Sequence, residues 1–188
     1  MKMFIAGDIQ ETDLIGKCKN GDTRAFGLLM HQYRRRLYGY LLKTTKNNNA
    51  AEDLLQETLI KVWRGMGKYE EKTRFSSWLF TIAHNVCVDH FRKYKTSSCE
   101  SLNEEYSNAA DDSDPLSQLE LNEEKKALLK GIEELPEKQK RVLLLRIYSG
   151  LTFKEISGIT DEPVNTVLSH MYYAVRKMKK IMKVENGE

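Results

Sequence analysis

Proline is scarce in this sequence, and long hydrophobic runs are absent. The 188 residues contain three prolines, Pro115, Pro136 and Pro163, so long stretches are free to form uninterrupted helices. No apolar run approaches the roughly 20 residues that a bilayer-spanning helix needs, and residues 1–13 lack the apolar stretch of a secretory signal. Hydrophobic residues make up 40% and charged residues 30% of the chain, which is typical of a globular protein with a highly charged surface. We therefore expect a cytoplasmic protein with no direct membrane insertion.

The sequence also lacks the cysteine pairs that bind zinc or form disulfides. Cys18, Cys87 and Cys99 are odd in number and have no Cys-x-x-Cys spacing, so reduced thiols are expected. His84 and Cys87 lie three residues apart and could supply half of a zinc site, but no second pair of ligands is evident. There is no glycine-rich catalytic loop. The sequence therefore predicts no metal, no cofactor and no catalytic residue.

Charges of opposite sign are separated along the chain, although the net charge is only +3. Residues 61–95 contain eight Lys or Arg and three Asp or Glu, residues 96–124 contain no basic and nine acidic residues, and residues 138–183 contain ten basic and three acidic residues. Two basic blocks around an acidic stretch indicate two modules that contact a polyanion and a segment that does not. Solvated helix surfaces are the alternative explanation.

Apolar residues recur every three or four positions over long stretches, which predicts an all-α protein. Residues 96–117 are rich in Ser, Asn, Asp and Glu, a composition typical of a linker. We expect two small helical domains, residues 1–95 and 119–188, joined by a flexible acidic linker over residues 96–118. The first helix is expected to begin after Gly21, with Asp22 or Thr23 as its N-cap.

A helix predicted over residues 51–64 has two unlike faces. The side expected to face the core carries Leu55, Leu59, Val62 and Trp63. The opposite side carries Asp53, Glu57, Ile60 and Arg64. An acidic strip with one exposed aliphatic residue is unusual on a lone helix, so we interpret it as a docking face. A solvated acidic surface is the alternative.

A third helix, predicted over residues 76–94, is flanked by cations interleaved with aromatic residues. The preceding loop contributes Lys68, Tyr69, Lys72, Arg74 and Phe75, and the end of the helix contributes His90, Phe91, Arg92, Lys93, Tyr94 and Lys95. This combination suits single-stranded nucleic acid, because cations pair with phosphates while unstacked bases lie on the rings. Alternatively, the cations at the helix end simply stabilise its C-terminus.

The C-terminal domain has the pattern of a helix-turn-helix. Residues 152–155 read TFKE, a capping box, and Pro163 suits the first turn of the next helix. The predicted buried stripe of that last helix is Val167, Met171, Ala174 and Met178. Its far side carries Asn165, Ser169, Tyr172, Tyr173, Arg176 and Lys180. Such a face can read base edges in the major groove and hold phosphates. A plain antiparallel helical pair is the alternative.

Three blocks in this order resemble the bacterial RNA polymerase sigma factors, specifically the small two-domain extracytoplasmic-function (ECF) group of the sigma-70 family. AEDLLQETLIKVW, residues 51–63, is similar to the family's polymerase-binding helix. FSSWLFTIAHNVCVDHFRK, residues 75–93, is similar to its promoter-melting and minus-ten-reading segment. Residues 134–157 and 163–180 resemble its helix-turn-helix. The resemblance spans nearly the whole chain.

The resemblance implies a sigma factor, not an enzyme, that binds core RNA polymerase and directs promoter-specific transcription initiation. Residues implied to contact the clamp helices of the largest polymerase subunit are Asp53, Gln56, Glu57 and Ile60. Those implied to capture melted, single-stranded minus-ten DNA are Lys68, Tyr69, Lys72, Arg74, Phe75, Trp78, Asn85, Asp89, Arg92 and Lys93. Those implied to read double-stranded minus-thirty-five DNA are Asn165, Thr166, Ser169, His170, Tyr173, Arg176, Lys177 and Lys180. An anti-sigma factor is a further expected partner.

The recognition helix departs from the family pattern. Leu168 and His170 stand where members often have a basic pair, and Tyr173 stands where they often have a further Arg. Its face is therefore less cationic than usual, and the family's base preferences do not transfer to it. Asp161 occupies a turn position that is frequently Gly, but Asp adopts the left-handed conformation at modest cost.

Two other functions compete with this prediction. A two-domain helix-turn-helix regulator that does not recruit polymerase would not explain the acidic strip or the aromatic and basic third helix. A DNA-processing enzyme would need a nucleophile with arginines or a carboxylate cluster that holds a metal. Mg²⁺-dependent hydrolysis that survives purification would favour the enzyme.

Overall fold

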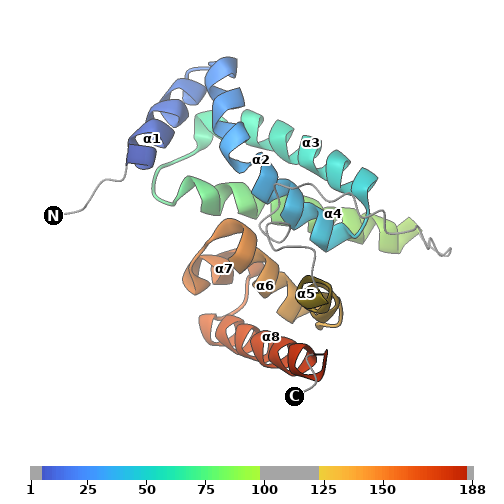
Figure 1. Ribbon diagram of the computed structural model, residues 1–188. Coiled ribbons are helices and arrows are strands. Elements are labelled where there is room, and N and C mark those ends of the chain that lie inside the picture. Colours follow the sequence, from blue (N-terminus) through green and yellow to red (C-terminus); the bar gives the residue numbers. More distant parts are fainter. Residues whose placement is uncertain (1–5, 98–122, 186–188) are drawn as a thin grey trace.

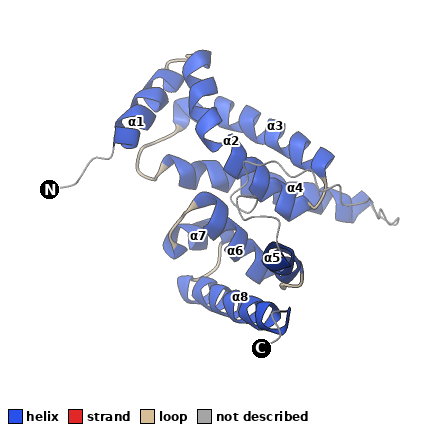
Figure 2. Ribbon diagram, in the orientation of Figure 1, coloured by secondary structure: helices blue, strands red, loops and turns tan. Residues whose placement is uncertain are grey.

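The computed structural model describes residues 6–97 and 123–185, with side chains over residues 11–93 and 128–181. These residues are helical and include no strand, as Figure 2 shows. The first group of helices comprises α1 (Ala6–Lys19), α2 (Thr23–Thr45), α3 (Asn48–Gly65), the short 3₁₀ helix η1 (Met66–Lys68) and α4 (Phe75–Ser97). The second comprises α5 (Glu123–Glu133), α6 (Glu137–Ser149), α7 (Phe153–Thr160) and α8 (Val164–Glu185). The predicted all-α fold with two helical regions is confirmed.

The predicted linker lies almost wholly outside the described residues. Only positions 96 and 97 of it are described, and they extend α4 by two residues beyond the predicted domain boundary. Cys99 and residues 119–122 also lie outside. None of the described helices is both long and apolar enough to cross a bilayer.

Helix α2 runs through the first group, and its predicted start is confirmed. The Asp22 side chain accepts hydrogen bonds from the backbone N–H groups of Arg24 and Ala25 at 2.9 and 3.0 Å. This satisfies donors that have no partner within the helix. Helix α2 ends where Lys46 adopts a left-handed conformation, with φ of 58°. Asn47 then caps α3 by accepting from Ala50 N–H at 2.8 Å.

The first helix of the protein is α1, which the sequence pattern did not predict. It buries Leu14, Ile15 and Cys18 against the group, a set too small to give a clear helical period. Tyr33 of α2 donates a hydrogen bond to the Glu11 carboxylate at 2.7 Å, which fastens α1 to α2. Helix α1 also contacts η1, so it covers the segment that leads into the loop before α4.

In the second group, α8 packs against α5, α6 and α7 (Figure 1). Helix α6 ends at Gly150, whose φ of 66° is a left-handed conformation that glycine adopts without strain. Leu144 and Leu145 of α6 and Val167 of α8 are fully buried between these helices. The helix-turn-helix is therefore supported on a compact base.

The two helical groups are in contact with each other. Helix α6 lies against α2 and α4, and α7 lies against α4 (Figure 1). His84 of α4 is buried, with its Nδ1 atom 3.1 Å from the Tyr40 hydroxyl oxygen of α2. Burial and, to a smaller extent, the Arg141 guanidinium of α6 lower the pKa of His84 to about 4. Burial raises the pKa of the nearby Cys87 thiol to about 12. His84 thus makes a structural contact with Tyr40, and the described residues contain no group of three potential metal ligands.

Candidate polymerase and nucleic-acid interfaces

Helix α3 presents one acidic face to solvent. It buries Ala51, Leu54, Leu55, Thr58 and Val62, and the Thr58 hydroxyl donates to the Leu54 carbonyl at 2.7 Å. The α3 outer face consists of the residues on the opposite side: Asp53, Gln56, Glu57 and Ile60. Ile60, at the C-terminal end of this face, is 51% exposed. All four predicted polymerase contacts therefore share one surface, formed by a rigid helix.

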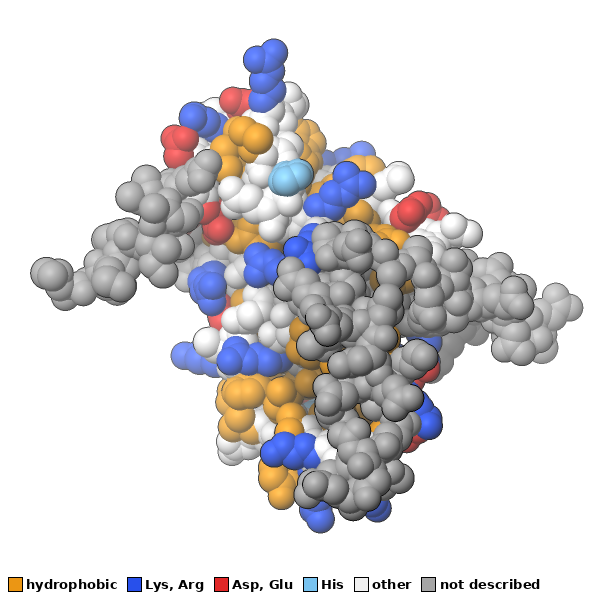
Figure 3. Space-filling view, viewed as in Figure 1, with side chains coloured by type: hydrophobic (Ala, Val, Ile, Leu, Met, Phe, Trp, Pro, Cys, Tyr) orange, Lys and Arg blue, Asp and Glu red, His pale blue; other side chains and the backbone are white. Residues whose placement is uncertain are grey.

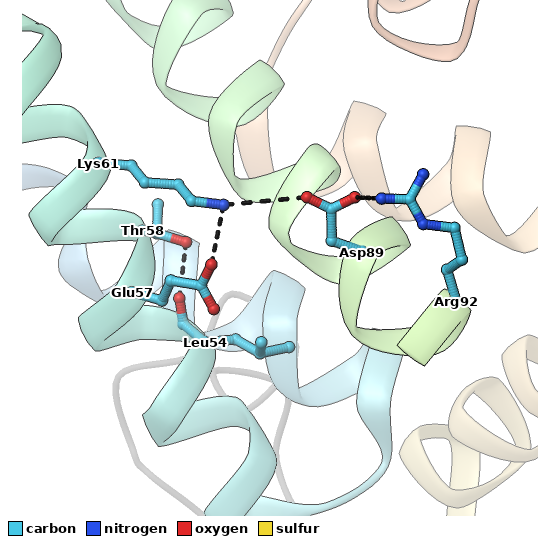
Figure 4. Close-up of polar contacts among 6 residues, drawn as sticks. All are labelled: Leu54, Glu57, Thr58, Lys61, Asp89 and Arg92. Carbon is cyan, nitrogen blue, oxygen red and sulfur yellow. Dashed lines mark hydrogen bonds and ion pairs between the residues drawn. The ribbon is translucent and has the colours of Figure 1, made fainter. Parts of the chain in front are cut away.

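A chain of ion pairs joins the α3 outer face to α4 (Figure 4). Lys61 Nζ lies 2.8 Å from a carboxylate oxygen of Glu57 and 4.0 Å from one of Asp89. Arg92 of α4 donates to the other Asp89 oxygen at 2.9 Å. Lys61 was not among the predicted functional residues. The spacing of Glu57 and Lys61 indicates an ion pair in the sequence, but only the packing of α3 on α4 brings Asp89 within reach.

Two aromatic residues predicted to meet unpaired bases belong to the core instead. Tyr69 is 6% exposed and Phe75 is 2% exposed, so neither ring is open to a base. Phe75 packs edge-on against Tyr33 and Tyr69, with ring centroids 5.5 Å apart in both pairs. The Tyr69 hydroxyl donates to the Thr73 carbonyl at 2.7 Å, which closes the loop on itself. The prediction that Tyr69 and Phe75 are exposed stacking platforms is therefore wrong.

Helix α1 explains part of this burial. Lys19 Nζ lies 5.4 Å from the centroid of the Tyr69 ring and 3.1 Å from the Glu71 carboxylate. Trp78 is half-buried, with its ring centroid 4.9 Å from that of Tyr69. A Cβ atom added to Gly65 would lie 2.9 Å from the Trp78 ring, so the end of α3 approaches α4 closely at a glycine. The loop aromatics thus fasten α3, α4 and α1 together.

The exposed surface of α4 lies towards its C-terminal end. Asn85, Arg92 and Lys93 are exposed there, as predicted, and Asp89 is half-exposed. Val88 and Phe91 are 42% and 41% exposed on the same part of the helix. Phe91, which lies among basic residues in the sequence, was not among the predicted site residues. The loop cations Lys68, Lys72 and Arg74 are also exposed, and Lys72 pairs with Glu70 at 2.5 Å.

The predicted helix-turn-helix is formed by α7 and α8. Thr152 accepts from Glu155 N–H at 3.3 Å, and the Glu155 carboxylate accepts from Thr152 N–H at 2.8 Å, so the capping box is confirmed. Asp161 ends α7 in the left-handed conformation, with φ of 53°. Ile156 and Ile159 face inward as predicted, because the capped start fixes the rotation of α7.

Helix α8 separates a buried stripe from an exposed face. Val167, Ala174 and Met178 are buried and Met171 is partly buried. We define the α8 outer face by its exposed polar and aromatic residues: Asn165, Ser169, Tyr172, Tyr173, Arg176 and Lys180. In the lower part of Figure 3, where Figure 1 places α7 and α8, hydrophobic side chains lie open on the surface beside Lys and Arg.

Three predicted minus-thirty-five residues are not on this outer face. His170 is half-buried, and its Nε2 atom lies 3.5 Å from the Glu162 carboxylate. Lys177 is half-buried and donates to the backbone carbonyl of Glu134, beyond the end of α5. Thr166 is also half-buried. The wheel of α8 turns these residues towards α5 and α6, so their prediction as outward-facing base readers is not supported by the packing.

The turn between α7 and α8 is held by Glu162. Its carboxylate lies 2.9 Å from Lys138 Nζ of α6, and its backbone carbonyl accepts from the Ser157 hydroxyl at 2.6 Å. The hydrogen bond from Lys138 is the main cause of the lowered pKa of Glu162. Glu162, held by Lys138 and Ser157, thus braces the turn beside His170.

Comparison with known proteins shows that both helical groups match regions of one protein family. Residues 29–96 match sigma-70 region 2, and residues 125–178 match sigma-70 region 4, together more than half of the chain. The RNA polymerase sigma-H factor of Pseudomonas aeruginosa is 28% identical over 92% of this chain and 94% of its own length. The ECF RNA polymerase sigma-E factor of Haemophilus influenzae is 27% identical over 90% and 94%. The chain belongs to the ECF group of the sigma-70 family.

The fold of this sigma factor agrees with that assignment. The sigma factor RpoE of Bartonella quintana, solved in complex with the anti-sigma factor NepR, superposes with a TM-score of 0.59. That match has 24% identity and covers 79% of this chain and 90% of the other. Region 2 contains α3, α4 and most of α2, and region 4 contains most of α5 and α8 with all of α6 and α7. The chain is a promoter-directing RNA polymerase sigma factor, and sigma factors are non-enzymatic initiation factors that bind core polymerase and DNA.

Proposed function

We propose that this sigma factor divides its work among three surfaces. The α3 outer face binds the clamp helices of the largest polymerase subunit, the exposed end of α4 holds melted minus-ten DNA, and the α8 outer face reads minus-thirty-five duplex. The observation that supports this division is the opposite charge of two exposed faces. The α3 outer face carries Asp53 and Glu57, whereas the α8 outer face carries Arg176 and Lys180. Phosphates are repelled by the first face and attracted by the second.

The end of α4 suits a single strand because it combines cations with an exposed ring. Lys93 can pair with a phosphate, Arg92 can do so by exchanging its surface partner Asp89, and Phe91 offers a ring on which an unpaired base can stack. Stacking on a protein ring contributes about 1–3 kcal/mol per base, and duplex opening costs about 1.4 kcal/mol per base-pair step. One captured base therefore offsets about one opened step.

A separate part of the proposal concerns a protein inhibitor. The sigma factor RpoE of Bartonella quintana is solved with an anti-sigma factor bound. We infer that a protein of this class also binds the present chain, in competition with core polymerase. A pull-down of core polymerase by the tagged chain, repeated with increasing amounts of a candidate anti-sigma protein, tests this inference: recovery of polymerase should fall as the inhibitor is added, and unchanged recovery would reject it.

Transcription in vitro with core polymerase and fragments of the native genome tests the main proposal. We expect the intact chain to start RNA synthesis at defined sites. Asp53→Arg should abolish core binding, because it places a cation in the acidic α3 outer face. Glu52→Arg makes the same charge change at an exposed residue one turn before Gln56, at the border of the α3 outer face, and it should weaken core binding less than Asp53→Arg does. Unchanged core affinity of Asp53→Arg would reject the docking assignment.

The upstream contact is tested separately. Arg176→Ala should keep core affinity and weaken binding to the minus-thirty-five duplex by about 1–3 kcal/mol. The competing regulator without polymerase binding predicts the reverse pattern: DNA binding by the intact chain, no association with core polymerase and no effect of Asp53→Arg.

A further inference from the structure

The first turns of α8 carry an apolar edge, formed by Val164, Leu168 and Tyr172, of which only Tyr172 belongs to the α8 outer face. Val164, Leu168 and Tyr172 are 37%, 42% and 60% exposed. They are spaced four residues apart, so they form one line along the helix beside the α8 outer face. Single exposed apolar residues are common, but three in line at the start of a recognition helix call for a partner.

The neighbouring line of residues has few free hydrogen-bond donors. The Ser169 hydroxyl donates to the Asn165 backbone carbonyl at 2.9 Å, so its proton is used within the helix. His170 is turned towards Glu162. The Asn165 side chain remains as an exposed amide in the first turn. The exposed surface of the first two turns of α8 therefore offers a ligand one side-chain amide, that of Asn165, and an apolar edge.

Duplex DNA is the partner that fits this combination. The thymine C5-methyl group is the apolar feature of the major groove, whereas the other base edges there display hydrogen-bonding atoms. An Asn side chain pairs with the N6 and N7 atoms of adenine, the partner of thymine. Further along α8, Arg176, Lys179 and Lys180 are exposed cations that complement the phosphates on either side of the groove. The amide and the apolar edge thus both favour A·T base pairs.

We propose that Val164 and Leu168 read thymine methyl groups in the minus-thirty-five duplex, next to an adenine bound by Asn165. This inference rests on the proposed function of α8 and adds its base preference. Tyr172 extends the apolar edge towards the third turn.

A library of duplexes with a randomised upstream segment, bound to the full chain with core polymerase, provides the test. The sequences recovered from this library are resynthesised with deoxyuridine in place of thymidine at single positions. Each replacement removes one methyl group and keeps base pairing. Deoxyuridine at a contacted position should weaken binding about two- to fivefold, since a buried methyl group contributes about 0.8 kcal/mol. Leu168→Ala should weaken binding to the thymine duplex by a similar factor and bind the deoxyuridine duplex as the unmodified chain does.

Lys179→Ala is the matched control, because loss of a phosphate contact should weaken both duplexes by the same factor. Equal binding of thymine and deoxyuridine duplexes by the unmodified chain would overturn the inference. So would a Leu168→Ala variant that keeps the full thymine preference. If no sequence is enriched at all, the proposed minus-thirty-five function of α8 fails together with the inference. Enrichment without a thymine effect leaves that function standing and removes only the base preference.

Discussion

The two helical groups treat their exposed charges differently. In region 2, Glu57, Lys61, Asp89 and Arg92 neutralise one another between α3 and α4. On α8, Arg176, Lys179 and Lys180 form no ion pair within the residues that the structure describes. Paired charges hold neighbouring helices in position, whereas cations without a protein partner are ready to bind phosphate. The difference indicates that the charges between α3 and α4 in region 2 fix the relative position of two helices. The exposed cations of α8 in region 4 are available to phosphates.

The aromatic residues show the same contrast. Phe75 and Tyr69 of region 2 are sealed into the core, while Tyr172 and Tyr173 of region 4 remain on the surface with ring centroids 5.4 Å apart. Rings near the loop of region 2 stabilise the scaffold, and only Phe91 of the basic segment in α4 has an exposed side chain for a ligand within the described residues.

The largest expected effect separates a buried ring from an exposed one. Phe75→Ala should lower the free energy of unfolding by about 3–5 kcal/mol, because it leaves a cavity between Tyr33 and Tyr69. Phe91→Ala should change it by less than about 0.5 kcal/mol but weaken binding to single-stranded minus-ten DNA. Urea unfolding and strand-binding measurements on both variants check this. If Phe75→Ala keeps its stability but no longer binds single-stranded minus-ten DNA, Phe75 contacts the DNA and is not a core residue.

Acid should weaken the contact around His84. Its pKa is about 4 in the folded protein and about 6.5 when unfolded, so the unfolded chain binds more protons between these values. Stability should therefore be unaffected by this group above pH 6.5 and fall as the pH drops towards 4, by up to about 3 kcal/mol. His84→Gln should lack this part of the pH dependence in urea unfolding between pH 7.5 and 4.5. Parallel curves for the two proteins would show that His84 does not resist protonation in the fold.

A smaller effect tests the close approach of α3 and α4. Gly65→Ala should destabilise the protein by about 1–3 kcal/mol, because the new Cβ would lie 2.9 Å from the Trp78 ring. Gly67→Ala is the control, since nothing lies within 4 Å of a Cβ there. Thermal unfolding of the two variants measures the difference, and equal midpoints would mean that Trp78 moves aside without cost.

The smallest effects concern the exposed charges themselves. Lys61→Ala should change stability by no more than about 1 kcal/mol, because its ion pairs are surface pairs. Lys180→Ala should leave stability unchanged and reduce the salt dependence of duplex binding by about one unit in log–log slope. Duplex titrations at several salt concentrations measure the slope. A changed slope for Lys61→Ala with none for Lys180→Ala would reverse the assignment of the two regions.

Local signals in the sequence predicted the helix-turn-helix well. The capping box at Thr152 and the stripe that includes Val167 were predicted from neighbours along the chain, and both are present. The left-handed conformation of Asp161, expected from the family's turn position, is also present. The acidic face of α3 was predicted by the same helical period. These features depend on contacts within one or two turns, which the order of residues determines directly.

Predictions that depended on distant contacts fared worse. Tyr69 was predicted to meet unpaired bases because it lies among cations in the sequence. In the fold, Lys19 of α1 and Trp78 of α4 lie against its ring. Helix α1 itself was missed because three buried residues gave too weak a period. His170 was assigned to DNA from its position in a motif, yet Glu162 of the turn lies beside it.

The sequence by itself determined every described α-helix except α1, the caps at Asp22 and Thr152, the polarity of α3 and α8 and the membership of the sigma-70 family, since these follow from residue order and local hydrogen bonds. Tertiary structure decided which aromatic rings remain available, which charges are already paired and where His84 and Tyr40 meet. Those properties depend on which helix covers which side chain, and that is set only when residues far apart in the chain exclude water from one another.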